Sequence, residues 1–220
     1  MMGLNKIQTL AVGLVSLFLT STPVLAGDED TYAVTITNVT AGQSFTPLLA
    51  ITHKKGQPLL TLGSPASPEL TRIAEGGDTS AFQNGLMDSG MAYDAASSGG
   101  LLGPGQSVTL HVKSKGGFKY LTVAGMLLPT NDGVIALNGM KLSKHSKTRM
   151  VPAYDGGTEL NDELCAHIPG PHCGGAPFSD EDGEGFVHIH PGINGVGDLQ
   201  ASQYDWKNPI AKITVKRMDD

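Results

Sequence analysis

The stretch Tyr120–Leu137, with the sequence YLTVAGMLLPTNDGVIAL, contains the strongest signal for the fold. Residues 120–128 are almost continuously apolar, as expected of a strand that is buried on both faces. Residues 129–133 are rich in turn-forming types, and a second apolar run follows at 134–137. The pattern therefore predicts a buried central strand, an acidic turn and a further short strand.

Other strands are predicted on both sides of this stretch, from alternating and β-branched residues. Their ranges are 32–39, 44–51, 107–112, 186–189 and 209–215. Helical signals are confined to a capped start at Ser67-Pro68 and to residues 81–87, and the Gly- and Ser-rich residues 89–105 predict a long loop. Many short strands without β-α-β alternation predict an all-β fold, an antiparallel C2-like β-sandwich with short helical insertions.

The N-terminus predicts an export signal. Lys6 precedes an apolar run at 7–19, and Val24 and Ala26 supply small residues before a cleavage point. We expect a signal peptide at residues 1–26 and a single domain at residues 27–220. Nothing later in the sequence is apolar over the roughly 20 residues that a membrane span needs. We therefore expect a secreted or periplasmic protein without a transmembrane segment after signal removal.

The charge balance bears on the partners of the protein. The chain has 21 acidic and 15 basic residues, for a formal net charge of −6. A nucleic-acid partner requires a basic footprint, so we expect none. Two local basic runs occur, one at residues 113–119 and one at residues 141–149. Lysines of this kind are typical of solvated strand edges and loops, and binding of a polyanion is the alternative.

The two cysteines, Cys165 and Cys173, enclose the short loop CAHIPGPHC. In an oxidising compartment, an even pair at this spacing predicts a disulfide. Such a bond over a small loop stabilises by about 2–3 kcal/mol at most. A metal site is the alternative, because His167 and His172 lie inside the same loop.

Two acidic turns contain the candidate metal ligands: PTNDG at residues 129–133 and YDGGTE at residues 154–159. Carboxylates on separate loops repel one another if they converge, unless a cation neutralises them. Glycines allow backbone carbonyls to turn inward as further oxygen ligands, which suits a hard cation such as calcium. The alternative is ordinary turn chemistry, since Asp-Gly is a common turn dipeptide.

The segments GMLLPTNDGVIAL (residues 125–137) and VPAYDGGTELND (residues 151–162) resemble the spondin N-terminal domain family, which is best known from F-spondin and mindin. The similarity extends from about residue 32 to the closing strand PIAKITVKR at residues 209–217. The family also occurs as nearly the whole chain of bacterial secreted proteins.

The resemblance implies a C2-like sandwich that binds one calcium ion at its loop end. By position, the acidic residue of the first turn corresponds to Asp132, and those of the second turn correspond to Asp155 and Glu159. Family members from animals have an aromatic residue after the first acid, where this chain has Gly133, and usually have Asp where it has Glu159. Glutamate also binds calcium and can do so through both oxygens.

Two histidines, His188 and His190, alternate in FVHIH and should lie on one face of a strand. Together with His167 or His172 they could bind a transition metal, whereas a simple polar strand face is the alternative. The acidic run at residues 180–184 resembles part of a calcium loop but lacks the spacing of an EF-hand. It favours a solvated loop.

The sequence contains no G-x-S-x-G elbow, H-E-x-x-H zinc motif or P-loop, so we expect no enzymatic activity. Trp206, the single tryptophan, favours core packing, with an exposed sugar- or protein-binding role as the alternative. We expect a secreted, calcium-binding module for adhesion or for recognition of an extracellular protein or glycan. The alternatives are a metal-dependent hydrolase using His188, His190 and a nearby carboxylate, and a polyanion or carbohydrate binder.

Overall fold

A computed structural model describes residues 29–178 and 182–218, and the expected signal peptide lies outside these ranges. The helices are α1 (Pro68–Gly76), α2 (Ser80–Asp88) and α3 (Ala201–Tyr204). The strands are β1 (Glu29–Asn38), β2 (Ser44–Phe45), β3 (Leu49–His53), β4 (Ala92–Ser97), β5 (Ser107–Lys115), β6 (Tyr120–Leu128), β7 (Gly133–Lys141), β8 (Lys147–Val151), β9 (Ala153–Asp155), β10 (His188–Ile189) and β11 (Ala211–Arg217). Across these described ranges, no helix is both long and apolar enough to cross a membrane.

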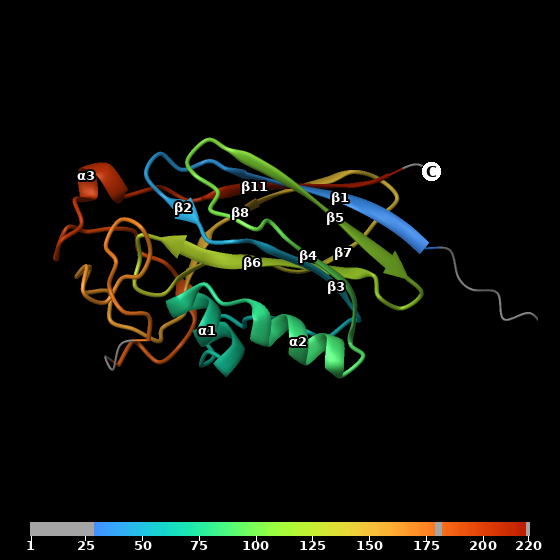
Figure 1. Ribbon diagram of the computed structural model, residues 1–220, viewed down its shortest axis with the longest axis horizontal. Coiled ribbons are helices and arrows are strands. Elements are labelled where there is room, and N and C mark those ends of the chain that lie inside the picture. The colour runs from blue at the N-terminus through green and yellow to red at the C-terminus, as the bar shows by residue number, and fades with distance from the viewer. Residues whose placement is uncertain (1–28, 179–181, 219–220) are drawn as a thin grey trace, which may run out of the picture.

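The strands form two antiparallel sheets. The four-stranded sheet has the order β5-β1-β11-β8, and the seven-stranded sheet follows β10-β9-β7-β6-β3-β4, with β2 paired to β6. Figure 1 shows the sheets as two layers, with α1 and α2 as a third layer on the seven-stranded sheet. The predicted all-β sandwich with short helical insertions is therefore confirmed. At one end, which we call the loop end, residues 129–132, 156–178 and 182–187 extend beyond the strands (Figure 1).

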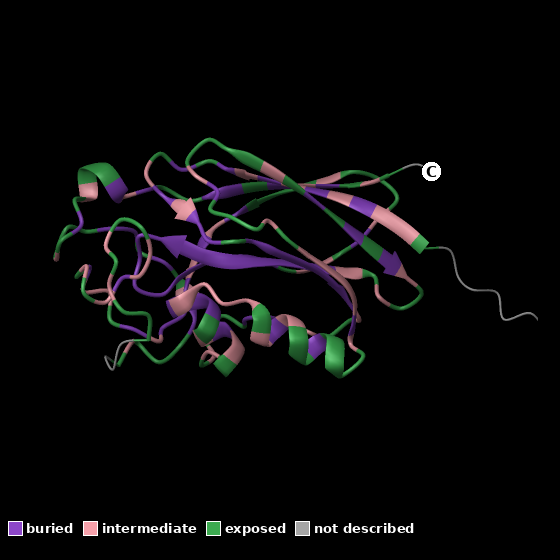
Figure 2. Ribbon diagram, in the orientation of Figure 1, coloured by how far each residue is buried: buried purple, intermediate pink, exposed green. Residues whose placement is uncertain are grey.

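The central strand β6 is buried along almost its whole length (Figure 2). One side of the seven-stranded sheet packs against the four-stranded sheet, and the other side packs against the helices. In the neighbouring strand β7, Ile135 belongs to the core between the sheets, whereas Val134 and Ala136 belong to the core beneath the helices. Burial on both faces explains why residues 120–128 read as a continuous apolar run rather than an alternating one.

The helical insertion begins where its sequence predicts. The Ser67 hydroxyl accepts a hydrogen bond from the Leu70 N–H at 3.2 Å, and Gly77 ends α1 in the left-handed conformation with φ of 66°. The prediction of one long loop over residues 89–105 was wrong, because β4 lies inside it. Its sequence AYDAAS has no β-branched residue, and its strand conformation comes from pairing with β3.

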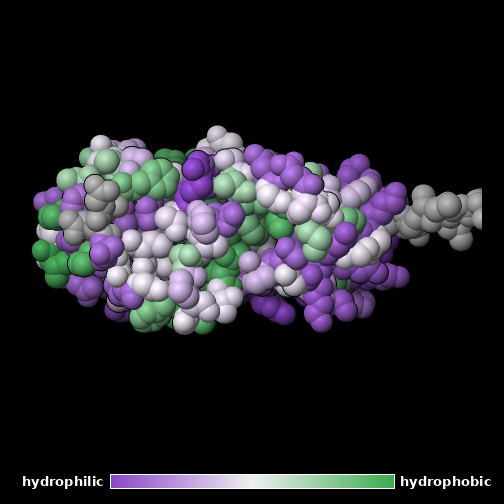
Figure 3. Space-filling model, turned by 90° about the horizontal axis from the view of Figure 1, so that it is seen from below, coloured by the Kyte–Doolittle hydropathy of each residue, from purple (hydrophilic) through white to green (hydrophobic). Residues whose placement is uncertain are grey.

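The two basic runs meet at the end of the sandwich opposite the loop end. Lys115 and Lys119, from the β5–β6 connection, and Lys144, from the β7–β8 connection, line a cavity of about 350 Å³ together with Tyr32 and Asp30. We call this region the basic end. Figure 3 shows that strongly hydrophilic residues predominate at that end of the molecule, on the right of the view.

Candidate metal centre

The register of three neighbouring strands assembles the site. Asp155, the last residue of β9, lies opposite Gly133 of β7 on one side and opposite His188 of β10 on the other. Asp132 comes immediately before Gly133. His190 follows His188 by two residues, so the alternation of an extended chain directs both rings to the same side. Pairing of β7, β9 and β10 thus gathers side chains that lie far apart in the sequence.

The inner group consists of Asp132, Asp155 and His190. A ligand atom from each lies within 4.8 Å of the other two, and the residues are 0%, 0% and 3% exposed. Asp132 Oδ2 accepts hydrogen bonds from the backbone N–H groups of Thr158 at 2.8 Å and Glu159 at 3.2 Å. Asp132 Oδ1 is buried and has no hydrogen-bond partner among residues 29–178 and 182–218. Among the described residues, no lysine or arginine forms an ion pair with either aspartate.

Two carboxylates this close repel each other strongly when both are ionised. At 4.8 Å and an effective dielectric constant of about 20, the repulsion is about 3 kcal/mol or more. Burial, and then the charge of Asp155, raises the pKa of Asp132 to about 8. Burial lowers the pKa of His190 to about 4, although the charge of Asp155 acts in the opposite direction. The histidine is therefore neutral near pH 7, and Asp132 holds a proton there unless a cation takes its place, which leaves the inner group suited to a cation.

The hydrogen bonds of His190 determine which of its nitrogens carries the proton. Nδ1 accepts a hydrogen bond from the Gly192 N–H at 3.1 Å, so the neutral ring has its proton on Nε2. Nε2 lies 3.9 Å from Asp155 Oδ2. In this tautomer His190 presents an N–H group to the carboxylates rather than a lone pair. The available ligand atoms of the inner group are consequently carboxylate oxygens, which hard cations such as calcium prefer.

Glu159, the third residue implicated by the resemblance, is buried beside this group. Its backbone N–H contributes to the hydrogen bonding of Asp132 Oδ2, but its carboxylate is not part of the group within 4.8 Å. Burial raises the pKa of Glu75 on α1, and the charge of Glu159 raises it further, so the two carboxylates are neighbours. The structure thus brings Asp132 and Asp155 together, whereas Glu159 lies outside their group. Its role as a ligand stays a prediction.

An outer group consists of Asp155, Glu184 and His188, again with ligand atoms within 4.8 Å of one another. This group forms because the loop that contains Gly157 closely approaches the loop that contains Phe186. Gly157 has φ of 65°, and a Cβ atom at this position would lie 2.2 Å from the Phe186 carbonyl oxygen. Burial lowers the pKa of His188, but the Ile189 carbonyl and the charges of Asp155 and Glu184 raise it by more.

The histidine pair was predicted to face one way, and both rings do approach Asp155. A third histidine, which the sequence left open as an alternative, does not join the pair: His167 contacts Asp162 at 2.6 Å, and His172 shares a hydrogen bond with Tyr204 at 2.9 Å. The partners of the pair are carboxylates instead. Of the acidic run at 180–184, Asp180 and Glu181 lie outside the described residues, and Glu184 belongs to the outer group. Its position beside His188 was not predicted.

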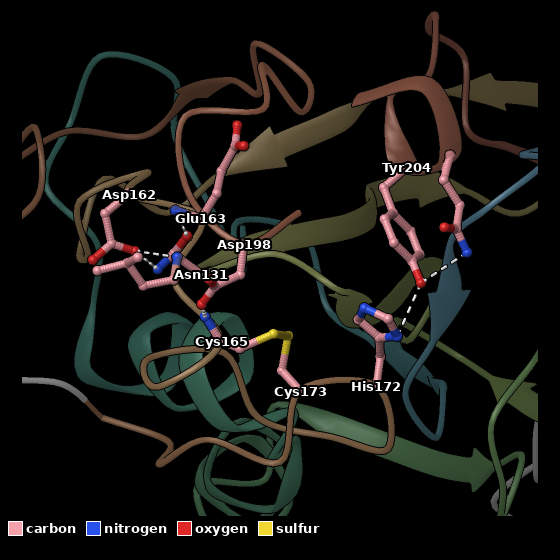
Figure 4. Close-up of a disulfide and its surroundings, with 10 residues drawn as sticks. Asn131, Asp162, Glu163, Cys165, His172, Cys173, Asp198 and Tyr204 are labelled. Carbon is pink, nitrogen blue, oxygen red and sulfur yellow. Dashed lines mark hydrogen bonds between the residues drawn. A yellow bond between two sulfur atoms is a disulfide. The ribbon is translucent and has the colours of Figure 1, made fainter. Parts of the chain in front are cut away.

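The predicted disulfide between Cys165 and Cys173 is confirmed (Figure 4). With both sulfur atoms in this bond, the alternative Cys/His metal site has no thiolate ligand. Trp206 is only 8% exposed and its ring centroid lies 5.0 Å from that of His190, so it packs behind the inner group. This confirms the core interpretation and excludes Trp206 as an exposed sugar platform.

Comparison with known proteins does not assign a family. No model of a known protein family matches the chain, and no curated protein matches its sequence.

Proposed function

We propose that this chain is an exported, non-enzymatic module in which a calcium ion binds between the acidic turns at the loop end. The turns would then present a defined surface to an extracellular protein or glycan. The resemblance to spondin N-terminal domains supports the calcium site. The disulfide supports export, because such bonds are typical of oxidising compartments. Asp132 and Asp155 would bind the ion, with Glu159 as a third ligand after a change of its side-chain rotamer.

The observation that carries this proposal is the unpartnered oxygen of Asp132. Buried polar atoms are nearly always hydrogen-bonded, and a lone buried carboxylate oxygen is costly. Oδ1 lies in a buried group. The other carboxylate of this group, Asp155, also has no lysine or arginine as an ion-pair partner among the described residues. A divalent cation would neutralise both aspartates and use this oxygen. A hairpin role for the Asp-Gly turns explains none of these features.

Thermal unfolding of the mature protein tests the proposal, with excess calcium compared against excess chelator. Binding at 100 times the dissociation constant stabilises the native state by about 2.7 kcal/mol. For a chain of this size, that corresponds to a rise in Tm of roughly 5–10 °C. We expect Asp132→Asn and Asp155→Asn to lose this rise.

Asp78→Asn provides the matched control, because Asp78 is a surface aspartate paired with Arg72. It should retain the full calcium response. Equal Tm values with calcium and chelator in the wild-type protein would overturn the calcium assignment.

A second candidate function, polyanion binding, is favoured by the convergence of the two basic runs. Lys115, Lys119 and Lys144 line one cavity, and its acidic residue, Asp30, is already paired with Arg217 at 3.0 Å. A sulfate or phosphate group would therefore meet mainly positive charge. The tendency of lysines to blunt sheet edges does not require runs from two separate connections to meet at one cavity.

Salt-dependent elution from an immobilised sulfated polysaccharide tests this second function. The double variant Lys119→Ala/Lys144→Ala should elute at lower salt than the wild-type protein, because fewer charges contact the matrix. Lys207→Ala, at the exposed side chain of a lysine near the loop end, is the control and should elute as the wild type does. Identical elution of all three proteins would reject polyanion binding at the basic end.

A further inference from the structure

The outer group has features that a calcium ion at the inner group does not use. Asp155 Oδ2 faces His190, whereas Asp155 Oδ1 faces His188 at a distance of 3.4 Å from its Nε2. Glu184 Oε2 lies 3.7 Å from the same nitrogen. The two groups thus share Asp155 and approach it through different oxygens.

The tautomer of His188 is the reverse of that of His190. His188 Nδ1 lies 3.0 Å from the Ile189 carbonyl oxygen, which can only accept, so Nδ1 carries a proton and donates it. Nε2 is left to face Asp155 and Glu184. This nitrogen is buried and has no hydrogen-bond partner in the described part of the chain. A backbone carbonyl that fixes one ring nitrogen while the other faces a cluster of carboxylates is the arrangement that orients metal-binding histidines.

The separations within the outer group match ligands around one small ion. Zinc bound tetrahedrally, with bonds of about 2.0–2.2 Å, keeps its ligand atoms roughly 3.3–3.6 Å apart. The distances of 3.4 and 3.7 Å from His188 Nε2 are close to this range and are longer than typical hydrogen bonds. They are the separations expected of ligands that contact a common ion rather than each other.

Asn161 holds the two carboxylates of the outer group in place. Its Nδ2 donates to Asp155 Oδ2 at 2.8 Å and to Glu184 Oε1 at 3.3 Å. The other oxygen of each carboxylate, Asp155 Oδ1 and Glu184 Oε2, is the one that faces His188. The side chains of His188 and Glu184 are 25% and 37% exposed, so an ion can enter from solvent and keep a water ligand.

We propose that Asp155, Glu184 and His188 form a second metal site, which binds a transition metal ion of the zinc class. One imidazole nitrogen and two carboxylate oxygens suit such an ion better than calcium. Asp155 would bridge the two sites, with one oxygen for each ion. The outer site shares this residue with the proposed calcium site but contains neither Asp132 nor Glu159, so it does not require that site to exist.

Calorimetric titration of the untagged mature protein with Zn²⁺ tests the second site, in calcium-free buffer and again in excess calcium. We expect a site with one Zn²⁺ per chain that excess calcium does not abolish. His188→Ala should lose this site, and Glu184→Gln should weaken it about 10-fold or more. Asp132→Asn should retain it, as should His111→Ala, which removes an exposed histidine from β5 and controls for surface binding.

The outcomes separate the two proposals. Failure of the wild-type protein to bind Zn²⁺ would overturn the outer site, as would binding that His188→Ala leaves unchanged. Loss of the zinc site in Asp132→Asn would also overturn it, because the zinc would then use the inner ligands. The calcium response of Tm is measured separately. It can therefore fail while zinc binding stands, or stand while zinc binding fails.

Discussion

Asp132 and Glu163 are both buried carboxylates at the loop end, but their surroundings differ. Glu163 is saturated by backbone donors: Oε1 accepts from the Asn194 N–H at 2.5 Å, and Oε2 accepts from the Gly195 and Val196 N–H groups at 2.7 and 2.9 Å. Within the residues that the structure describes, Asp132 has its donors on Oδ2 alone, and its Oδ1 has no partner. The same chemical group thus has a complete set of donors at one position and an incomplete set at the other.

The difference separates a carboxylate that is satisfied within the fold from one that is suited to a ligand. Glu163 connects residues 194–196 to the loop end in the absence of any ion. Asp132 has an equally complete set of partners only when a proton or a cation binds its Oδ1 atom. Asn131 links Asp132, its neighbour in sequence, to Glu163. Its Oδ1 accepts a hydrogen bond from the Glu163 N–H, and its Nδ2 donates one to Asp162 (Figure 4). One turn therefore serves the loop scaffold through residue 131 and the candidate metal site through residue 132.

The largest effect should come from Glu163→Ala. It removes the acceptor of three backbone N–H groups, although water can reach some of them in the variant. We expect the free energy of unfolding to fall by about 2–4 kcal/mol, measured by urea denaturation. The loss should be the same with calcium and with chelator, because Glu163 is outside the metal groups. If calcium restored the full free energy of unfolding to Glu163→Ala, the distinction between Glu163 and Asp132 would be wrong.

Asn131→Ala should have a smaller effect of the same kind. Two hydrogen bonds to a buried side chain are lost, which corresponds to about 1–2 kcal/mol. Because Asp132 keeps its own donors, the calcium-induced rise in Tm should remain within about 2 °C of the wild-type rise. A comparison of Tm in calcium and chelator checks this. Disappearance of the calcium response would mean that residues 131 and 132 act as one unit.

The sequence allowed most strands and one pair of site residues to be predicted. The run at residues 120–128 and the alternation at residues 32–39 are local signals, and both segments are strands. Asp132 and Asp155 could be identified because each lies in a turn with glycine beside it. The edge strands β4 and β8 were not predicted, because both depend on pairing with a neighbouring strand and β4 has no β-branched residue.

The rest of the site depends on long-range register and on hydrogen bonds, neither of which is visible in sequence. Pairing of Asp155 with His188 across β9 and β10 decides that the histidines meet carboxylates rather than His167 or His172. The opposite tautomers of His188 and His190 depend on one carbonyl and one N–H group. Glu163 gave no signal at all, because its partners are backbone N–H groups.

The last effect that we predict is a dependence of stability on pH in chelator. The native pKa of Asp132, about 8, exceeds its ordinary value of 3.8. Between these values the native chain holds a proton that the unfolded chain releases, so stability falls as pH rises. His188, whose pKa is also raised, acts in the same direction, whereas the lowered pKa of His190 acts oppositely only below pH 6.5. Between pH 6.5 and 8, the change in stability therefore comes mainly from Asp132 and His188 rather than from His190.

Over this window we expect the wild-type free energy of unfolding in chelator to decrease by about 1–2 kcal/mol, measured by urea denaturation at each pH. Asp132→Asn should remove most of the decrease, and His188→Ala should remove the remainder. Asp155 and Glu184, the carboxylates that face these groups, are unchanged in both variants. Saturating calcium should abolish the part of the fall that Asp132 causes in the wild-type protein, because a bound ion keeps Asp132 ionised in the native state. A fall of equal size in Asp132→Asn would place the responsible proton on another group and remove the main contrast with Glu163.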